Sequence, residues 1–116
     1  MNTDAHRAAA EDLEHSIADL GDPATRPYNG RALIELYWGA AFEWLAYGCG
    51  RKLGKHKEKH DGLARFLRDV SESGMADRWA AMEGVRQGGF YGHHVAAADV
   101  EQARQLWQDI RTWALS

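Results

Sequence analysis

The spacing of apolar residues predicts helices along most of the chain. In the first stretch Leu13, Ile17 and Leu20 recur at intervals of three and four residues, which is typical of a helix with one buried face. Thr3 or Asp4 is expected to cap its start, and the Gly-Asp-Pro sequence after Leu20 is expected to end it. The pattern therefore predicts a first helix with a polar outer face.

Residues 31–49, with the sequence RALIELYWGAAFEWLAYGC, are apolar on nearly every side of a helix. Such a helix is surrounded by protein rather than lying on the surface. Asn29 is expected to cap it, and Gly48, Gly50 and Gly54 are expected to break the helical pattern. The preceding DPATRPYN contains both prolines of the chain and is expected to be a connector.

Helical spacing predicts three further helices in the second half of the chain. A short one follows Asp61 and ends around SESG, and the next reaches the glycine pair Gly88 and Gly89. The last is expected to begin near Asp99, which with Gln102 fits a capping box. It carries one apolar stripe, made of Val100, Ala103, Trp107, Ile110 and either Trp113 or Ala114.

No stretch shows the alternating pattern of a strand, so the sequence predicts an all-α fold. We expect an up-and-down helical bundle of four main helices plus a short helix, in a single domain spanning residues 1–116. A chain with 45% hydrophobic and 27% charged residues is typical of a globular protein. Its five tryptophans fall on helical stripes, which favours core packing or a dimer interface over stacking with bases.

The single cysteine, Cys49, cannot form an internal disulfide bond. The first ten residues lack the basic and apolar regions of a secretory signal, and no apolar run approaches the roughly 20 residues of a membrane-spanning helix. These features predict a cytoplasmic protein without a membrane partner.

Positive charge is concentrated in the segment RKLGKHKEKH at residues 51–60. Its lysines Lys55, Lys57 and Lys59 are candidates for contacts with an RNA backbone, although lysines in a loop are also often only solvated. The net charge of -3 argues against an overall nucleic-acid footprint, and no DNA partner is expected.

The stretch VRQGGFYGHH, residues 85–94, gathers side chains suited to phosphodiester chemistry. An arginine such as Arg86 can donate two parallel hydrogen bonds to a phosphate, and a histidine such as His93 can exchange a proton near neutral pH. The glycine pair between them would let the chain bend and bring both into one cleft. In a metal-free RNA cleavage His93 would take the 2′-hydroxyl proton, Arg86 would stabilise the phosphoryl oxygens, and Tyr91 could add a hydrogen bond.

The same residues also allow a purely structural interpretation. Arg86 would then pair with a carboxylate of the bundle, the glycines would end a helix, and the histidines would be exposed. Glu35 and Glu43 on the apolar helix are candidate partners, because a charge there is costly to bury unless it is paired. A carboxylate that holds Arg86 would also be needed in a functional site.

Three stretches together resemble the HEPN family, the helical domains named for higher-eukaryote and prokaryote nucleotide-binding proteins. The first, RALIELYWGAAFEWLAYGC, is similar to the long second helix of the family. The second, KHKEKHDGLARFL, is similar to the start of its third helix. The third, VRQGGFYGHH, is similar to its Arg-x4-6-His motif. The resemblance covers about residues 29–113. It implies a metal-independent endoribonuclease in which Arg86 and His93 act, commonly with two motifs facing each other across a homodimer.

The resemblance leaves the histidine position open between His93 and His94. Other family members have Arg-x3-Asp-Tyr without a histidine, and Arg86 and Tyr91 match that arrangement, with Phe90 in place of the aspartate. Gln87 stands where a small polar residue is usual. We therefore take Arg86 and His93 as catalytic candidates and Gln87, Tyr91 and His94 as supporting ones.

A metal site formed by histidines is not expected. His56, His60, His93 and His94 could be grouped, but neither a cysteine nor a Glu-His pair accompanies them. The family resemblance instead suggests that His60 caps or anchors the third helix. We expect neither a metal ion nor another cofactor.

The sequence thus predicts a HEPN-like protein that acts at a homodimer cleft, either as a metal-independent endoribonuclease or as an RNA- or nucleotide-binding protein. The alternative is a non-catalytic interaction module, such as a toxin-antitoxin component pairing with a nucleotidyltransferase, or a helical dimer that binds a small ligand.

Overall fold

The computed structural model describes residues 2–21, 29–57, 59–90 and 95–116, with residues 89 and 90 described by their backbone alone. Five helices lie in these ranges, and none of the ranges contains a strand. The helices are α1 (Thr3–Leu20), α2 (Gly30–Leu53), α3 (Leu63–Asp69), α4 (Ser73–Phe90) and α5 (Ala97–Leu115). The prediction of an all-α bundle with four main helices and a short one is confirmed.

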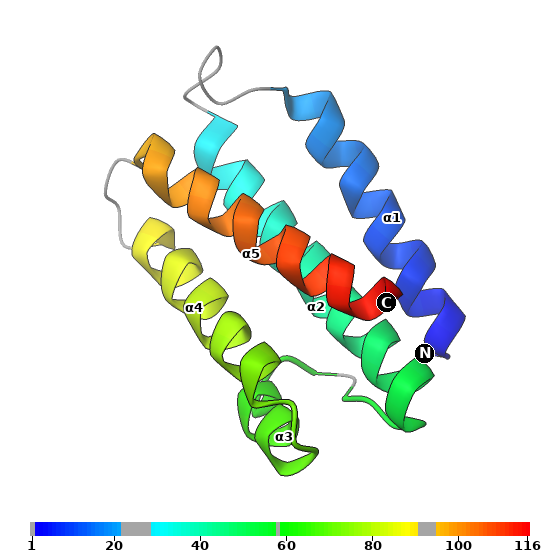
Figure 1. Cartoon of the computed structure of the whole chain (residues 1–116). Helices are drawn as coiled ribbons and strands as arrows, with labels where there is room; N and C mark the ends of the chain where they lie inside the picture. The colour runs from blue at the N-terminus through cyan, green and yellow to red at the C-terminus, as the bar shows by residue number, and fades with distance from the viewer. Residues whose placement is uncertain (1, 22–28, 58, 91–94) are drawn as a thin grey trace.

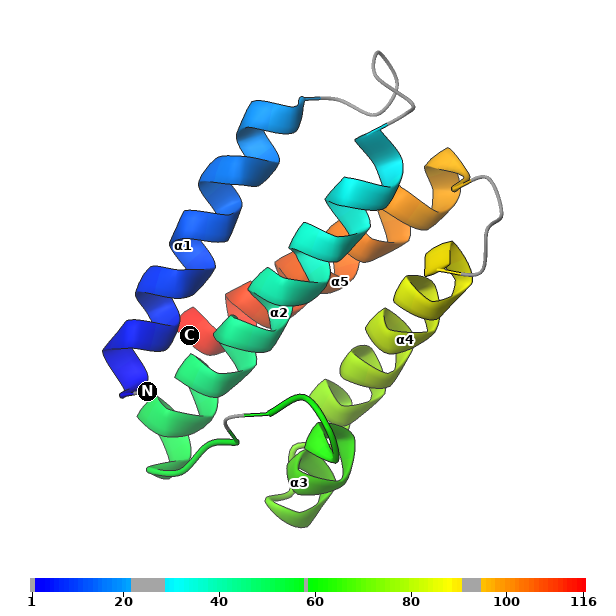
Figure 2. The ribbon, with the colours of Figure 1, turned by 180° about the vertical axis from the view of Figure 1, so that it is seen from behind.

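The four long helices run alternately up and down, and α2 lies in the middle of them (Figure 1). It packs against α1, α5 and α4, and α4 also packs against α5. The view from behind shows the short α3 next to the first turns of α4, at the same end of the bundle as the last turns of α2 (Figure 2). The connection from α2 to α4 therefore crosses one end of the bundle.

The predicted burial of α2 is confirmed. Half of its residues are buried, and Leu33, Ala41, Trp44 and Leu45 are at most 1% exposed. Trp44 and Trp79 are fully enclosed, and the other three tryptophans pack against the core. The five tryptophans therefore serve packing within the chain.

One carboxylate on α1 ties three helices together. Oε2 of Glu14 accepts hydrogen bonds from the indole nitrogens of Trp44 on α2, at 2.7 Å, and Trp107 on α5, at 2.8 Å. Nε of Arg111 on α5 donates to the same oxygen at 3.2 Å. These bonds satisfy polar atoms that packing of the large rings would otherwise leave without partners.

Several helix ends differ from the prediction. The cap of α1 is Asn2, whose side chain accepts a hydrogen bond from the Ala5 amide at 2.8 Å. The side chain of Asn29 makes no cap on α2 and instead donates to the Leu20 carbonyl at 2.9 Å, so it closes the end of α1. The capping box predicted for α5 is absent because the helix begins two residues earlier, at Ala97.

The glycines of α2 do not break the helix before Gly54. Gly54 ends it in the left-handed conformation, with φ of 72°. Gly48 and Gly50 stay helical because neighbouring side chains fill the space that a Cβ would take: the Trp113 ring at Gly48 and Thr3 at Gly50. These two glycines therefore mark close packing and not a turn.

None of the helices in the described ranges combines the length and the apolar character needed to cross a bilayer.

Replacing Gly48 by alanine tests this packing. A Cβ at Gly48 would lie 3.0 Å from Cε3 and Cη2 of Trp113, so the ring must shift, and we expect a loss of about 1–2 kcal/mol in the free energy of unfolding. Gly84→Ala on α4 is the matched control, because a Cβ there meets nothing within 4 Å. It should stabilise the protein by about 0.5–1 kcal/mol. Urea unfolding measures both, and equal effects of the two changes would contradict this account.

The buried Cys49 provides a second test. Burial, with a smaller contribution from Glu72, raises the pKa of this thiol to about 11. At pH 8 the folded protein should therefore react with iodoacetamide at least about 100-fold more slowly than the protein unfolded in urea, since the thiolate is the reactive form. Similar rates in both states would show that the thiol is accessible.

Candidate functional site

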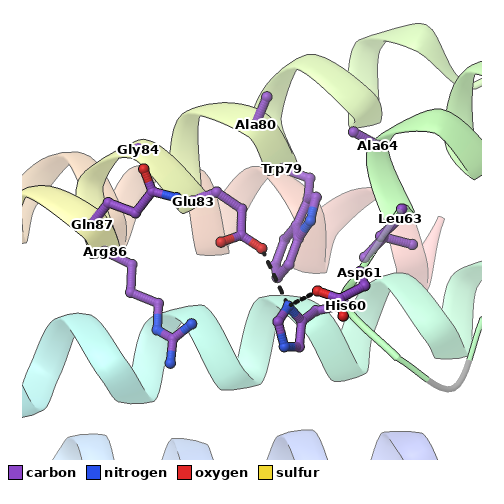
Figure 3. Close-up of a pocket in the computed structure, with 11 residues that line it drawn as sticks. His60, Asp61, Leu63, Ala64, Trp79, Ala80, Glu83, Gly84, Arg86 and Gln87 are labelled. Carbon is purple, nitrogen blue, oxygen red and sulfur yellow. Dashed lines mark ion pairs between the residues drawn. The ribbon is translucent and has the colours of Figure 1, made fainter. Parts of the chain in front are cut away.

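An open pocket of about 720 Å³ lies between the start of α3 and one face of α4. The close-up shows its lining side chains, with those of α4 on one side and those around the start of α3 on the other (Figure 3). The lining residues are His60, Asp61, Gly62, Leu63, Ala64, Trp79, Ala80, Glu83, Gly84, Arg86 and Gln87. The pocket thus brings together two groups that can bind anions or exchange protons, Arg86 and His60.

Arg86 is held on two sides by residues of α2. Its Nε lies 3.2 and 3.1 Å from the two carboxylate oxygens of Glu35, in a partly buried ion pair. Its Cζ lies 3.9 Å from the centre of the Trp38 ring, so that the guanidinium group covers the indole. Charge attraction and cation-π contact together fix the position of the side chain.

This arrangement leaves the two terminal nitrogens of Arg86 without a hydrogen bond to any described residue. A guanidinium group held through Nε and through its face can still donate two parallel hydrogen bonds from its outer edge, which is the geometry that suits a phosphate. The predicted pairing of Arg86 with a carboxylate of α2 is confirmed, and Arg86 also lines the pocket. The carboxylate is Glu35, since Glu43 accepts from Nδ1 of His6 at 2.6 Å.

Gln87, a supporting candidate, is exposed and lines the same pocket. Tyr91, His93 and His94 lie outside the described residues. The predicted bend at the glycine pair is wrong, because α4 continues through Gly88 and Gly89 to Phe90. Gly88 has open space around it, so the helix passes it without a steric obstacle.

His60 belongs to the pocket, and of its two expected roles, capping or anchoring α3, the side chain does not take that of a cap. The residue before α3 is Gly62, in the left-handed conformation, and only the backbone carbonyl of His60 accepts a hydrogen bond from the Leu63 amide. The imidazole ring stands edge-on to Trp38, with 5.2 Å between the ring centres. Its Nδ1 lies 3.5 Å from a carboxylate oxygen of Asp61 and 3.7 Å from one of Glu83 (Figure 3).

The three lysines proposed as RNA contacts do not line the pocket. Lys57 lies beside it, since its Nζ donates a hydrogen bond to the Asp61 carbonyl at 3.0 Å. Lys55 and Lys59 are exposed. The basic segment therefore approaches the pocket through Lys57.

Within the described ranges, histidine, cysteine and carboxylate side chains form no cluster of three or more that could hold a metal ion. The two described histidines of the grouping considered above contact different residues. His56 stands edge-on to His6, with 4.7 Å between the rings, whereas His60 contacts Trp38.

No protein family model matches the chain, and neither the curated proteins nor the solved structures contain a significantly similar one.

Sequence reasoning did not identify His60 and Glu83 as pocket residues. A signal was present for one of them, because Trp79, Glu83, Arg86 and Gln87 follow at helical spacing and share one face of α4. His60 gave no comparable signal, because the chain between α2 and α3 has no regular period that would indicate its direction.

A double-mutant cycle tests the anchoring of Arg86. We expect Glu35→Gln and Arg86→Gln to show a coupling of about 0.5–1 kcal/mol in the free energy of unfolding, because the pair is half-buried and joined by two contacts. The matched cycle uses Arg78 and Asp109, which join α4 to α5 through one contact at 3.4 Å. That coupling should be smaller, and a Glu35–Arg86 coupling near zero would refute the anchoring.

Proposed function

We propose that this protein binds the phosphodiester backbone of RNA at the pocket on α4 and cleaves it without a metal ion. The observation that carries the proposal is the position of Arg86, which lines the pocket and is held by Glu35 and Trp38, while no described residue accepts a hydrogen bond from its terminal nitrogens. A guanidinium group fixed in advance stabilises developing negative charge without having to reorganise during the reaction.

The surroundings of Arg86 fit an extended, anionic ligand. The pocket is open to solvent, so an extended ligand can enter it, and Gln87 offers a neutral hydrogen-bonding group next to the arginine. Lys57 lies beside the opposite end of the pocket, where it can contact a neighbouring phosphate. An RNA strand bound at Arg86 would thus meet a second positive charge.

The resemblance to HEPN domains adds the chemistry of cleavage to this proposal. It assigns to His93 the removal of the 2′-hydroxyl proton, with Arg86 on the phosphoryl oxygens. It further supports a homodimer in which two such sites face each other. His94 and Tyr91 stay supporting candidates in this scheme.

Cleavage of a mixed RNA pool in excess chelator tests the proposal. The wild-type protein should cleave, and Arg86→Ala should lower the rate by about 100-fold or more, as removal of a preorganised donor does. Arg86→Lys should recover little of the loss, because lysine cannot form the paired hydrogen bonds. His93→Ala should also be inactive, with helical content unchanged by circular dichroism.

Arg78→Ala is the matched control for this experiment. Arg78 also lies on α4 and also pairs with a carboxylate of a neighbouring helix, but it does not line the pocket. Its loss should leave cleavage unchanged. Absence of cleavage by the wild-type protein, or equal losses in the Arg78 and Arg86 variants, would exclude the proposed nuclease and favour a non-catalytic interaction module.

A further inference from the structure

Cleavage of RNA without metal requires two proton transfers. The 2′-oxygen loses a proton as it forms its bond to phosphorus, and the 5′-oxygen gains a proton as its bond to phosphorus breaks. In the proposed function His93 takes the first proton, whereas the source of the second is not assigned. A second proton-exchanging side chain is therefore expected close to Arg86.

His60 lies in the position that this step requires. It lines the same pocket as Arg86, and both side chains rest on the indole of Trp38. The ring centre of His60 and Cζ of Arg86 are separated by no more than about 9 Å, the most that their two distances to Trp38 allow. Figure 3 shows both side chains directed toward α2, one on each side of Glu83. A phosphate held by Arg86 can thus have one of its ester oxygens near the imidazole.

The two ring nitrogens of His60 have different surroundings. Nδ1 faces Asp61 and Glu83, which form ion pairs with the ring when it carries a proton. No described residue forms a hydrogen bond with Nε2, and the ring is 45% exposed, so this nitrogen can reach a ligand in the pocket. A carboxylate on one nitrogen that orients the other toward the substrate is the arrangement of a catalytic histidine.

Glu83 is the more effective of the two carboxylates. It is 26% exposed and comes from the rigid α4, whereas Asp61 is 86% exposed and its charge is screened by water. Among the described residues, Arg86 from α4 is the other charged group that lines the pocket, and Lys57 lies beside it, bound to the Asp61 backbone. The orientation of His60 therefore depends mainly on Glu83 and on the Trp38 ring.

We infer that His60 is the general acid of this site, giving its Nε2 proton to the leaving 5′-oxygen of the RNA. The inference rests on the proposed function and adds a second catalytic residue to it. His60 ends the step as a neutral imidazole, the RNA chain ends in a 5′-hydroxyl, and the 2′-oxygen closes a cyclic phosphate on the other fragment.

A change of leaving group tests this role. The substrates are two RNA dinucleotides in excess chelator, one with the natural 5′-oxygen and one with sulfur in its place, because a thiolate leaves without receiving a proton. His60→Gln should cleave the oxygen substrate about 100-fold or more slowly than the wild-type protein, as loss of an acid does. It should cleave the sulfur substrate at the wild-type rate. Glu83→Gln should show the same pattern with a smaller loss.

Two variants separate this inference from the proposed function. Arg86→Ala should be slow on both substrates, because charge on the phosphoryl oxygens develops with either leaving group. His15→Gln, at an exposed histidine of α1, should match the wild-type protein on both. Two results would overturn the general-acid role alone. Either the His60→Gln variant keeps full activity on the oxygen substrate, or it cleaves both substrates equally slowly. A wild-type protein that cleaves neither substrate overturns the proposed function and the general-acid role together.

Discussion

The enclosure of α2 by the other long helices is the constraint on which the structure depends. A helix that is apolar on nearly every side must be covered by protein, and α1, α4 and α5 provide the cover. Its few polar side chains then need partners on those helices. Glu35 pairs with Arg86 on α4, and Glu43 pairs with His6 on α1. The candidate site is one consequence of this requirement, because the pairing that makes Glu35 tolerable on α2 also fixes Arg86 at the pocket.

Trp38 connects this packing to the chemistry of the pocket. One indole receives the guanidinium group of Arg86 and the edge of His60, and it also packs against the buried Trp79. The two polar groups are therefore positioned by a ring that belongs to the partly buried margin of the core. Sites held by packed aromatic rings keep their geometry because protein interiors are densely packed and hardly compressible. Arg86 and His60 thus share a rigid support although they lie far apart in the sequence.

The fold could be predicted from the sequence, because hydrophobic periodicity alone identified the helices and the central place of residues 31–49. Helix ends were predicted less well. The sequence pattern predicts that Gly48 and Gly50 break the helix, whereas they accommodate Trp113 and Thr3. Only the tertiary structure reveals these contacts. Arg86 and its pairing with an α2 carboxylate were anticipated. His60 was not, because the irregular chain between α2 and α3 gives no indication of where a side chain points until α4 is in place.

The proposed function depends most on the terminal nitrogens of Arg86 being the contact for an RNA phosphate. Nitrogen-15 NMR of the arginine side chains, during titration with an RNA oligonucleotide whose 2′-O-methyl groups prevent cleavage, observes these atoms directly. If the proposal holds, the signals of the terminal nitrogens of Arg86 shift and saturate with added RNA, whereas those of Arg78 on the same helix do not. RNA that binds the protein and leaves the Arg86 signals unchanged would contradict it.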